Sequence, residues 1–200
     1  PYEKDERVKN NFKKLHFVTA LLLVSLLLIM AAPANLYKAQ AGNSNLASVG
    51  EGVFSIFHIT DTQTLTNAAN RTYLFDQQSQ WIINNSAYFN NKMVIHTGDI
   101  QDYGNVIDQW INANKSMSLL MNNAIPYLWC AGNHDLNPMG TSNGKWLGRN
   151  YAAFNPSNFN TQSYWVSNFS DGKNTATKFS FTNNDQIYNF LVVALEYDAN

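Results

Sequence analysis

Three short apolar runs, with longer amphipathic segments between them, set the pattern of the first part of the chain. Val53–Ile59, Met93–Ile95 and Ile125–Ala131 have the aliphatic, β-branched and aromatic content of buried strands. Between them, Asn67–Phe89 and Val106–Met121 place apolar residues at helical spacing, the former over one or two helices. Strands that alternate with helices of this length predict βαβ crossovers and a mainly parallel sheet, so the fold class is α/β.

The second part of the chain follows a different pattern. Residues 136–162 are rich in Asn, Gly, Ser and Pro and predict a long loop. The Trp and Tyr residues from Trp146 to Trp165 either line a substrate cleft or pack within the loop. Beyond it, Ser163–Val166, Lys178–Phe181 and Tyr188–Leu195 predict strands separated by Asp-Gly and Asn-Asn turns. We therefore expect the second half to be β-rich.

The N-terminal segment has the parts of an export signal. A 16-residue apolar run, Phe17–Ala32, follows a polar stretch that ends in lysines, and an Ala39-x-Ala41 site comes after it. The alternative is an uncleaved N-terminal anchor, for which the run is slightly short of the roughly 20 residues that span a bilayer. Both readings predict an exported domain, either secreted or anchored to the outer face of the cytoplasmic membrane, with a membrane link only through this anchor.

Length and composition limit the remaining possibilities. Two hundred residues, 45% of them hydrophobic, suffice for one domain with a core. We divide the chain into a leader (1–41), a linker (42–52) and a domain (53–200). The sequence begins at Pro1 rather than Met and stops at Asn200 directly after a predicted strand, so we expect the domain to be truncated at its C-terminus.

Charge and cysteine content exclude two classes of protein. Only 14% of residues are charged, against roughly 25% in typical soluble domains, and asparagine supplies much of the polarity. No basic stripe suited to a nucleic-acid backbone is present, which argues against a dedicated nucleic-acid binder. Cys130 is the single cysteine, so an intrachain disulfide framework is excluded for these residues.

Polar side chains follow each of the first three predicted strands. Because the carboxyl ends of parallel strands share one edge of a sheet, we expect these side chains to lie close together. Carboxylate and amide oxygens are metal ligands, and two divalent metals need a bridging carboxylate with terminal ligands on either side. The candidates are Asp61 and Gln63 after the first strand, Asp99 after the second, and Asn133, His134 and Asp135 after the third.

Four neighbouring residues have simpler interpretations. His58 lies within an apolar strand, which favours a hydrogen-bonded core histidine. His96 is interpreted mainly as packing, with hydrogen bonding to a metal ligand as the alternative. Asp102 precedes Val106 and is interpreted as a helix cap. Cys130 is interpreted as a small buried hydrophobic residue, because no histidine partner is implied.

The polar clusters form three motifs in a fixed order: Asp61-x-Gln63, Gly98-Asp99 and Gly132-Asn133-His134-Asp135. They resemble the first three motifs of the calcineurin-like metallophosphoesterases, which read Asp-x-His, Gly-Asp and Gly-Asn-His-Asp/Glu. The resemblance covers roughly Val53 to Leu195. It implies a sandwich of two mixed β-sheets flanked by helices, of which this chain carries the first part.

The resemblance also implies a set of metal ligands. Asp61 would bind one metal, Asp99 would bridge both, and Asn133 would bind the other. Gln63 stands where the family most often has His, and it would ligate more weakly through its oxygen. The metals would be two divalent or mixed-valence ions of Mn, Fe, Zn or Ni. No histidine follows His134, so we expect the family's later histidine ligands beyond residue 200.

The implied activity is hydrolysis of phosphoester bonds by a metal-activated hydroxide. His134 would contact the phosphate and stabilise the transition state or protonate the leaving oxygen, and Asp135 would hold its imidazole. Phosphomonoesters, phosphodiesters, nucleotides and phospholipid headgroups are all open as substrates. The sequence therefore predicts a metallophosphoesterase.

Two other functions compete with this prediction. A non-catalytic exported cell-surface binding domain on the same scaffold fits Gln63 and the weakly charged, amide-rich composition. A glycosidase would use Asp61 and Asp99 as its acid and base without a metal, but it leaves Asn133 and His134 without a role.

Overall fold

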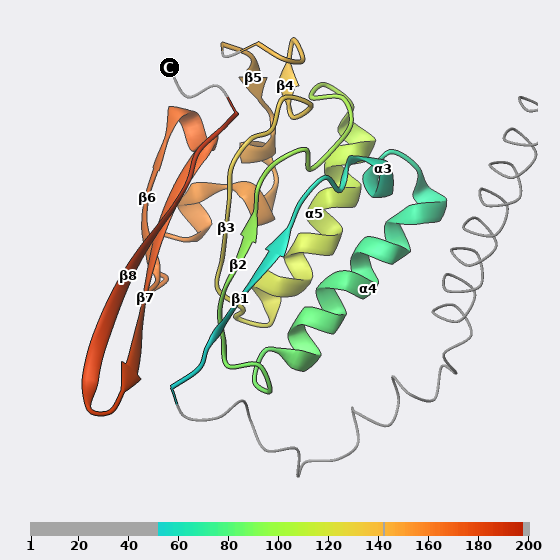
Figure 1. The fold of residues 1–200 in the computed structure, drawn as a ribbon. Coiled ribbons are helices and arrows are strands. Elements are labelled where there is room, and N and C mark those ends of the chain that lie inside the picture. The colour runs from blue at the N-terminus through green and yellow to red at the C-terminus, as the bar shows by residue number, and fades with distance from the viewer. Residues whose placement is uncertain (1–51, 142, 198–200) are drawn as a thin grey trace, which may run out of the picture. The chain divides into compact units, whose positions relative to one another are not determined.

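The computed structural model describes residues 52–141 and 143–197, and its first half is a βαβαβ unit (Figure 1). The predicted leader and nearly all of the linker lie outside the described residues. The strands pair in parallel in the order β1-β2-β3, which confirms the predicted parallel sheet. The elements are β1 (Ser55–Ile59), α3 (Gln63–Thr66), α4 (Ala69–Asn85), β2 (Asn91–His96), α5 (Ile107–Asn122) and β3 (Tyr127–Trp129).

Helices α4 and α5 cover one face of the parallel sheet (Figure 1). In α5 the apolar residues recur every three or four positions, so one stripe of the helix is buried: Trp110, Ala113, Met117 and Leu120. Helix α4 buries Phe75 and Ile82 in the same core. The sequence predicted both helices to within a few residues and missed only the single turn of α3.

An antiparallel sheet covers the other face. It consists of β6 (Trp165–Phe169), β7 (Asn174–Asn183) and β8 (Gln186–Ala194), in that order. Side chains alternate between the two faces of β2 and β3, so Val94 and Trp129 pack on the helix side while Met93 and Leu128 pack toward Ala194. The result is three layers, helix, parallel sheet and antiparallel sheet, which confirms the α/β fold class.

The β7–β8 hairpin is longer than the sequence predicts. Pairing runs from Thr175–Ala194 to Asn183–Gln186. Backbone hydrogen bonds extend the strands through polar Thr and Asn residues, which the apolar pattern did not mark as strand. Asn184 and Asp185 form the turn with φ of 49° and 62°, which Asn and Asp tolerate better than most side chains. The predicted Asp-Gly turn lies at Asp171-Gly172, in the 3₁₀ turn η4 (Ser170–Gly172) between β6 and β7.

The segment from 136 to 162 is mostly irregular, as predicted. It contains a two-residue strand pair, β4 (Leu136–Asn137) with β5 (Lys145–Trp146), and the 3₁₀ turns η1 (Gly148–Asn150), η2 (Ala152–Phe154) and η3 (Pro156–Asn158). Phe154 and Phe159 are almost fully buried and contact the ring of Trp129. The Trp and Tyr residues between Trp146 and Trp165 belong to or pack against the same core, and of these Trp146 also lines a cavity.

None of the helices in the described parts of the chain is long and apolar enough to cross a membrane.

The backbone conformation and close surroundings of Gly98 require glycine at this position. Gly98 has φ of 96°, and a Cβ there would lie 2.4 Å from the Gly132 nitrogen. Gly98→Ala should lower the free energy of unfolding in urea by more than about 3 kcal/mol, because strain and a backbone clash add together. Gly140 is the matched control, with φ of 72° and no atom within 4 Å of a Cβ. Its alanine variant should lose only about 1–2 kcal/mol; equal losses would contradict the prediction.

Candidate metal centre

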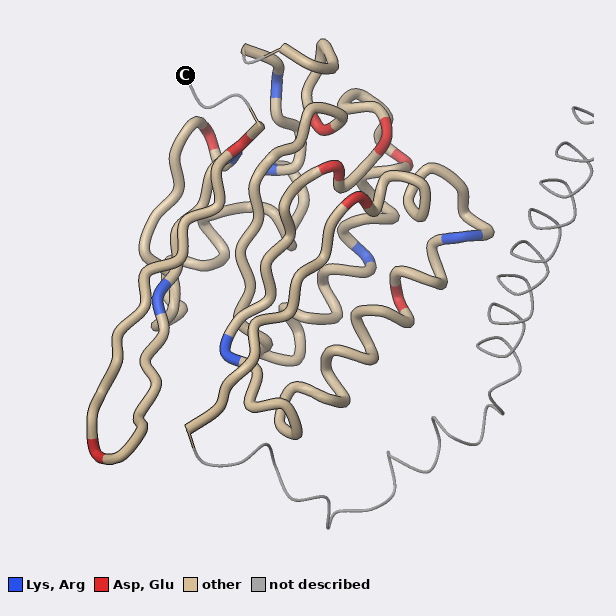
Figure 2. The backbone as a smooth tube through the Cα atoms, in the orientation of Figure 1, with Lys and Arg blue, Asp and Glu red and all other residues tan. Residues whose placement is uncertain are grey.

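The loops that follow β1, β2 and β3 meet at one edge of the parallel sheet. Asp99, on the loop after β2, contacts both the loop after β1 and the loop after β3. The Gln63 backbone N–H donates to the Asp99 carbonyl (3.0 Å), and the His134 backbone N–H donates to Asp99 Oδ1 (3.1 Å). The Asp61 N–H donates to the Gly98 carbonyl (3.3 Å). Figure 2 shows acidic residues at the ends of β1 and β2 on this edge. The predicted clustering of the three motifs is thereby observed.

The contact between the second and third loops requires glycine. A Cβ on Gly132 would lie 2.2 Å from Asp99 Oδ1 and 2.3 Å from the Asp99 nitrogen. Asp61 and Asp99 themselves have left-handed backbones, with φ of 53° and 49°. Such conformations persist in non-glycine residues where surrounding contacts enforce them, and they are concentrated at functional sites.

Asp135 connects the second and third loops from the inside. Its fully buried carboxylate accepts backbone N–H groups from Ile100 (2.9 Å), Gln101 (3.1 Å) and Gly132 (2.9 Å). Burial raises the pKa of Asp135 to about 7, while the N–H donors oppose the rise. The sequence-based prediction that Asp135 holds the His134 imidazole is wrong, because the Asp135 oxygens face these backbone donors and the imidazole Nδ1 lies against Asp102 instead.

Asp102 is the residue that holds His134. His134 Nδ1 lies 2.8 Å from the Asp102 carbonyl oxygen and 3.3 Å from its Oδ1. A carbonyl can only accept, so Nδ1 carries the proton and Nε2 is the nitrogen that can exchange a proton with a ligand. This hydrogen bond, with the charges of Asp99, Asp102 and Asp135, raises the pKa of His134 above its ordinary value against the effect of burial.

The helix-cap interpretation of Asp102 is wrong. Val106 is the N-cap residue of α5, and no side chain caps it. The position of Asp102 three residues after Asp99, in the same loop, was the one signal in the sequence for its role at the site.

His96 is a fully buried support for the loops and not a ligand. Its Nδ1 accepts the Gly98 N–H (3.3 Å), so Nε2 carries the proton and donates to Thr62 Oγ1 (3.1 Å). The Thr62 hydroxyl in turn donates to the Ile100 carbonyl (2.9 Å). Burial lowers the pKa of His96 to about 3, with a further contribution from His58, so His96 is neutral. The packing interpretation of His96 is confirmed.

The structure contradicts the prediction for His58 and confirms the one for Cys130. His58 is exposed and contacts Thr97 Oγ1 (2.8 Å), so its prediction as a core histidine is wrong. The antiparallel sheet packs on β2 and β3 and leaves this part of β1 uncovered in the described chain. Cys130 is buried, and burial raises its pKa to about 12, which confirms it as an unreactive hydrophobic residue.

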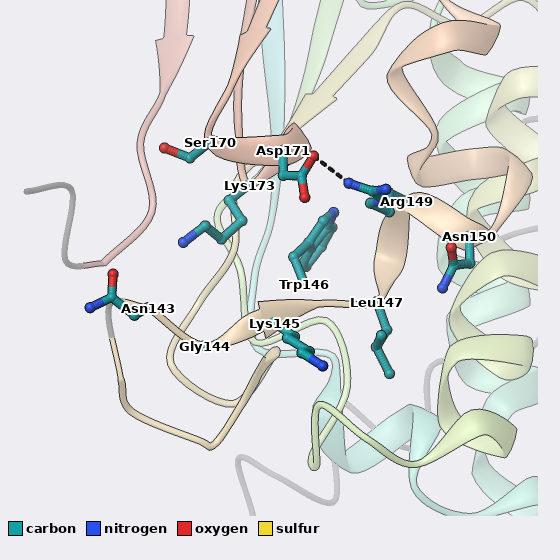
Figure 3. Close-up of a pocket in the computed structure, with 10 residues that line it drawn as sticks. All are labelled: Asn143, Gly144, Lys145, Trp146, Leu147, Arg149, Asn150, Ser170, Asp171 and Lys173. Atoms are coloured by element: carbon teal, nitrogen blue, oxygen red, sulfur yellow. Dashed lines mark ion pairs between the residues drawn. The ribbon is translucent and has the colours of Figure 1, made fainter.

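A cavity of about 610 Å³ borders the same end of β3 (Figure 3). Its walls come from β5, η1 and η4. Strand β5 pairs with β4, which begins directly after Asp135, and the Lys173 carbonyl accepts the Ala131 N–H (2.8 Å) directly before Gly132. The cavity is therefore built on the segments that flank the third motif.

Cationic side chains contribute much of the cavity lining. Lys145, Arg149 and Lys173 face it together with one acid, Asp171, which forms an ion pair with Arg149 (Figure 3). Lys173 also pairs with the buried Glu196 at 3.0 Å. The three cationic side chains and the two acids, Asp171 and Glu196, together carry a net charge of +1, which suits an anionic ligand.

Comparison with known proteins agrees with this geometry. The family model for calcineurin-like phosphoesterases matches residues 54–195. The chain belongs to this family. It is also 43% identical over 84 residues to the uncharacterized protein YvnB of Bacillus subtilis (strain 168), a match that covers 42% of this chain and 6% of that protein. The resemblance to calcineurin-like metallophosphoesterases is thus confirmed, in a family of metal-dependent phosphoester hydrolases.

The oxygen donors expected in a calcineurin-like phosphoesterase are placed on adjoining loops. Asp61, Asp99 and Asn133 follow β1, β2 and β3. Carboxylate and amide oxygens suit hard divalent ions such as Mn. Among the described residues, no group of three or more His, Cys, Asp and Glu side chains forms a metal site by itself. The role of Asp61, Asp99 and Asn133 as metal ligands stays a prediction.

Gln63 bridges the first two loops. With the amide oriented by its surroundings, Nε2 donates to the backbone carbonyls of Asp61 and Asp99, each at 3.0 Å. These bonds occupy the nitrogen and leave Oε1 as the atom that a metal could take. The assignment of Gln63 as a ligand is also still a prediction.

Asp135→Asn tests the internal connection between the loops. The variant should lower the free energy of unfolding by about 2–3 kcal/mol, because its NH₂ group would face at least one buried backbone N–H that then has no acceptor. Urea unfolding measures the loss. Asp185→Asn, in the exposed β7–β8 turn, is the control and should be nearly neutral. Equal stability of the two variants would count against the role of Asp135.

The buried neutral His96 predicts a pH dependence of stability. In the unfolded chain its pKa returns to about 6.5, so protons bind the unfolded state preferentially between that pH and about 3. The free energy of unfolding should therefore fall as the pH drops below 6.5, by up to about 1.4 kcal/mol per pH unit from this group. His96→Gln should remove this part of the slope. Parallel pH profiles for the two proteins would refute the assignment.

Proposed function

We propose that this chain is the catalytic domain of an exported phosphoesterase that hydrolyses phosphomonoesters or phosphodiesters at a dinuclear metal centre. The observation that carries the proposal is the contact of Asp99 with the complete Gly-Asn-His-Asp loop, through the bond from the His134 N–H to Asp99 Oδ1. Asp61, Asp99, Asn133 and Oε1 of Gln63 would hold the metals.

The residues of this chain have separate tasks in the proposed reaction. Bound divalent metals would polarise the phosphoryl oxygens and lower the pKa of a coordinated water. His134 would donate a proton from Nε2 to the leaving oxygen, since Nδ1 is held by Asp102. The His134 backbone N–H orients Asp99 Oδ1, and the buried Asp135 keeps the two loops in register. Geometry fixed before the substrate binds reduces the reorganisation needed during reaction.

The cationic cavity beside the third motif supports an anionic substrate. Lys145 lines it beside the ion pairs Arg149–Asp171 and Lys173–Glu196, and its walls flank the loop that carries His134. We propose a small phosphoester, including nucleotides and phospholipid headgroups, and no dedicated binding of nucleic acid. Any attachment to the membrane would come from the N-terminal segment.

A non-catalytic binding domain is the second candidate. The observation that favours it is Gln63, whose amide nitrogen bonds to two backbone carbonyls at a position where the family most often has a metal-binding histidine. The glycosidase alternative has no comparable support, because it gives no task to the contact between His134 and Asp102.

Hydrolysis of p-nitrophenyl phosphate and bis(p-nitrophenyl) phosphate by the whole protein without its leader tests the proposal. The protein is loaded separately with Mn, Fe, Zn and Ni and is then chelated. We expect hydrolysis that chelation abolishes, and His134→Ala should lower kcat by about 100-fold or more, as for loss of a general acid. Asp99→Asn should abolish the metal-dependent rate, while Asp185→Asn should retain it.

The outcomes separate the two candidates. A folded, metal-bound protein that hydrolyses neither ester supports the binding domain. A folded protein that binds none of the four metals refutes the metal centre itself.

A further inference from the structure

We infer that Asn67 is a positioning residue for His134 and acts through the Asp102 carboxylate. Asn67 directly follows α3, and its Nδ2 donates to Asp102 Oδ2 at 3.1 Å. The other oxygen of the same carboxylate, Oδ1, lies 3.3 Å from His134 Nδ1. Each carboxylate oxygen thus has its own partner, and rotation of the Asp102 side chain would break both contacts.

Arg71 fixes the direction of the Asn67 amide. Arg71 Nη2 donates to Asn67 Oδ1 at 2.8 Å. A guanidinium group only donates, so the amide oxygen must face Arg71 and the amide nitrogen must face Asp102. The contacts therefore converge on the Asp102 carboxylate, which accepts from Asn67 on one oxygen and faces the protonated Nδ1 of His134 with the other.

The backbone of Asn67 is anchored to the loops of the metal centre. Its N–H donates to the Gln63 carbonyl (3.0 Å), and the Gln63 N–H donates to the Asp99 carbonyl (3.0 Å). Asn67 therefore has a fixed position relative to Asp99, the predicted bridging ligand. The contacts link the loop after β1 to His134 on the loop after β3, through a pair of residues 35 positions apart in the sequence.

The catalytic part of the test rests on the proposed function. Asn67→Ala should lower kcat for the better of the two p-nitrophenyl esters by about tenfold, as loss of a residue that orients a catalytic group typically does. KM should change less than about twofold, because the Asn67 side chain, which the variant removes, contacts Asp102 and Arg71 rather than a proposed ligand. Asn67→Asp, which keeps the size but replaces the donor with an acceptor, should lose as much. Asn70→Ala, an exposed asparagine in the same region, should keep the full rate.

A double-mutant cycle distinguishes positioning from a general structural effect. If Asn67 acts through Asp102, adding Asn67→Ala to Asp102→Ala should lower kcat no further. Additive losses would overturn the inference. Thermal unfolding of each variant identifies any loss that comes from a smaller folded fraction.

An NMR measurement on the metal-free protein separates this inference from the proposed function. The imidazole signals of His134 are assigned by comparison with His134→Gln. In the wild type its Nδ1–H proton should be protected from exchange with water, and Asn67→Ala and Asn67→Asp should both increase that exchange while Asn70→Ala should not. Unchanged exchange in both Asn67 variants overturns the inference, even if the protein hydrolyses neither ester.

Discussion

The buried carboxylate of Asp135 is the interaction on which the rest of the site depends. A carboxylate with no exposure to water must have its hydrogen-bonding capacity used within the protein, and here three backbone N–H groups from two loops use it. The loops can approach so closely only because Gly98 and Gly132 have no side chains. Asp99 and His134, one on each loop, are thereby brought into hydrogen-bonding contact.

The three-layer fold supplies the rigidity that this arrangement needs. The helices and the antiparallel sheet bury opposite faces of β2 and β3, so the ends of these strands have fixed positions (Figure 1). The metal ligands predicted from the motifs then follow rigid strands, and the neutral His96 fills the space beneath them. Membership of the calcineurin-like phosphoesterases explains why carboxylate, amide and imidazole groups occur together at this edge.

Periodicity and motifs predicted much of this from the sequence. The spacing of apolar residues predicted the helices around Phe75 and Trp110, because a helix with one buried stripe has apolar residues every three or four positions. The apolar runs predicted the parallel strands, because a strand buried on both faces is apolar along its length. The three motifs placed Asp61, Asp99 and Asn133 at one edge. The full length of the β7–β8 hairpin was not predicted, because backbone pairing rather than apolar content extends those strands.

The sequence by itself determined the fold class, the family resemblance and the candidate donor residues, because these depend on residue type and local spacing. Only the tertiary structure decided which side chain serves which partner. Asp135 follows His134 directly yet bonds to backbone groups, whereas Asp102 and Asn67, distant in sequence, orient the imidazole. Such assignments depend on the direction of each side chain after loops from different strands have packed, and residue order does not record that direction.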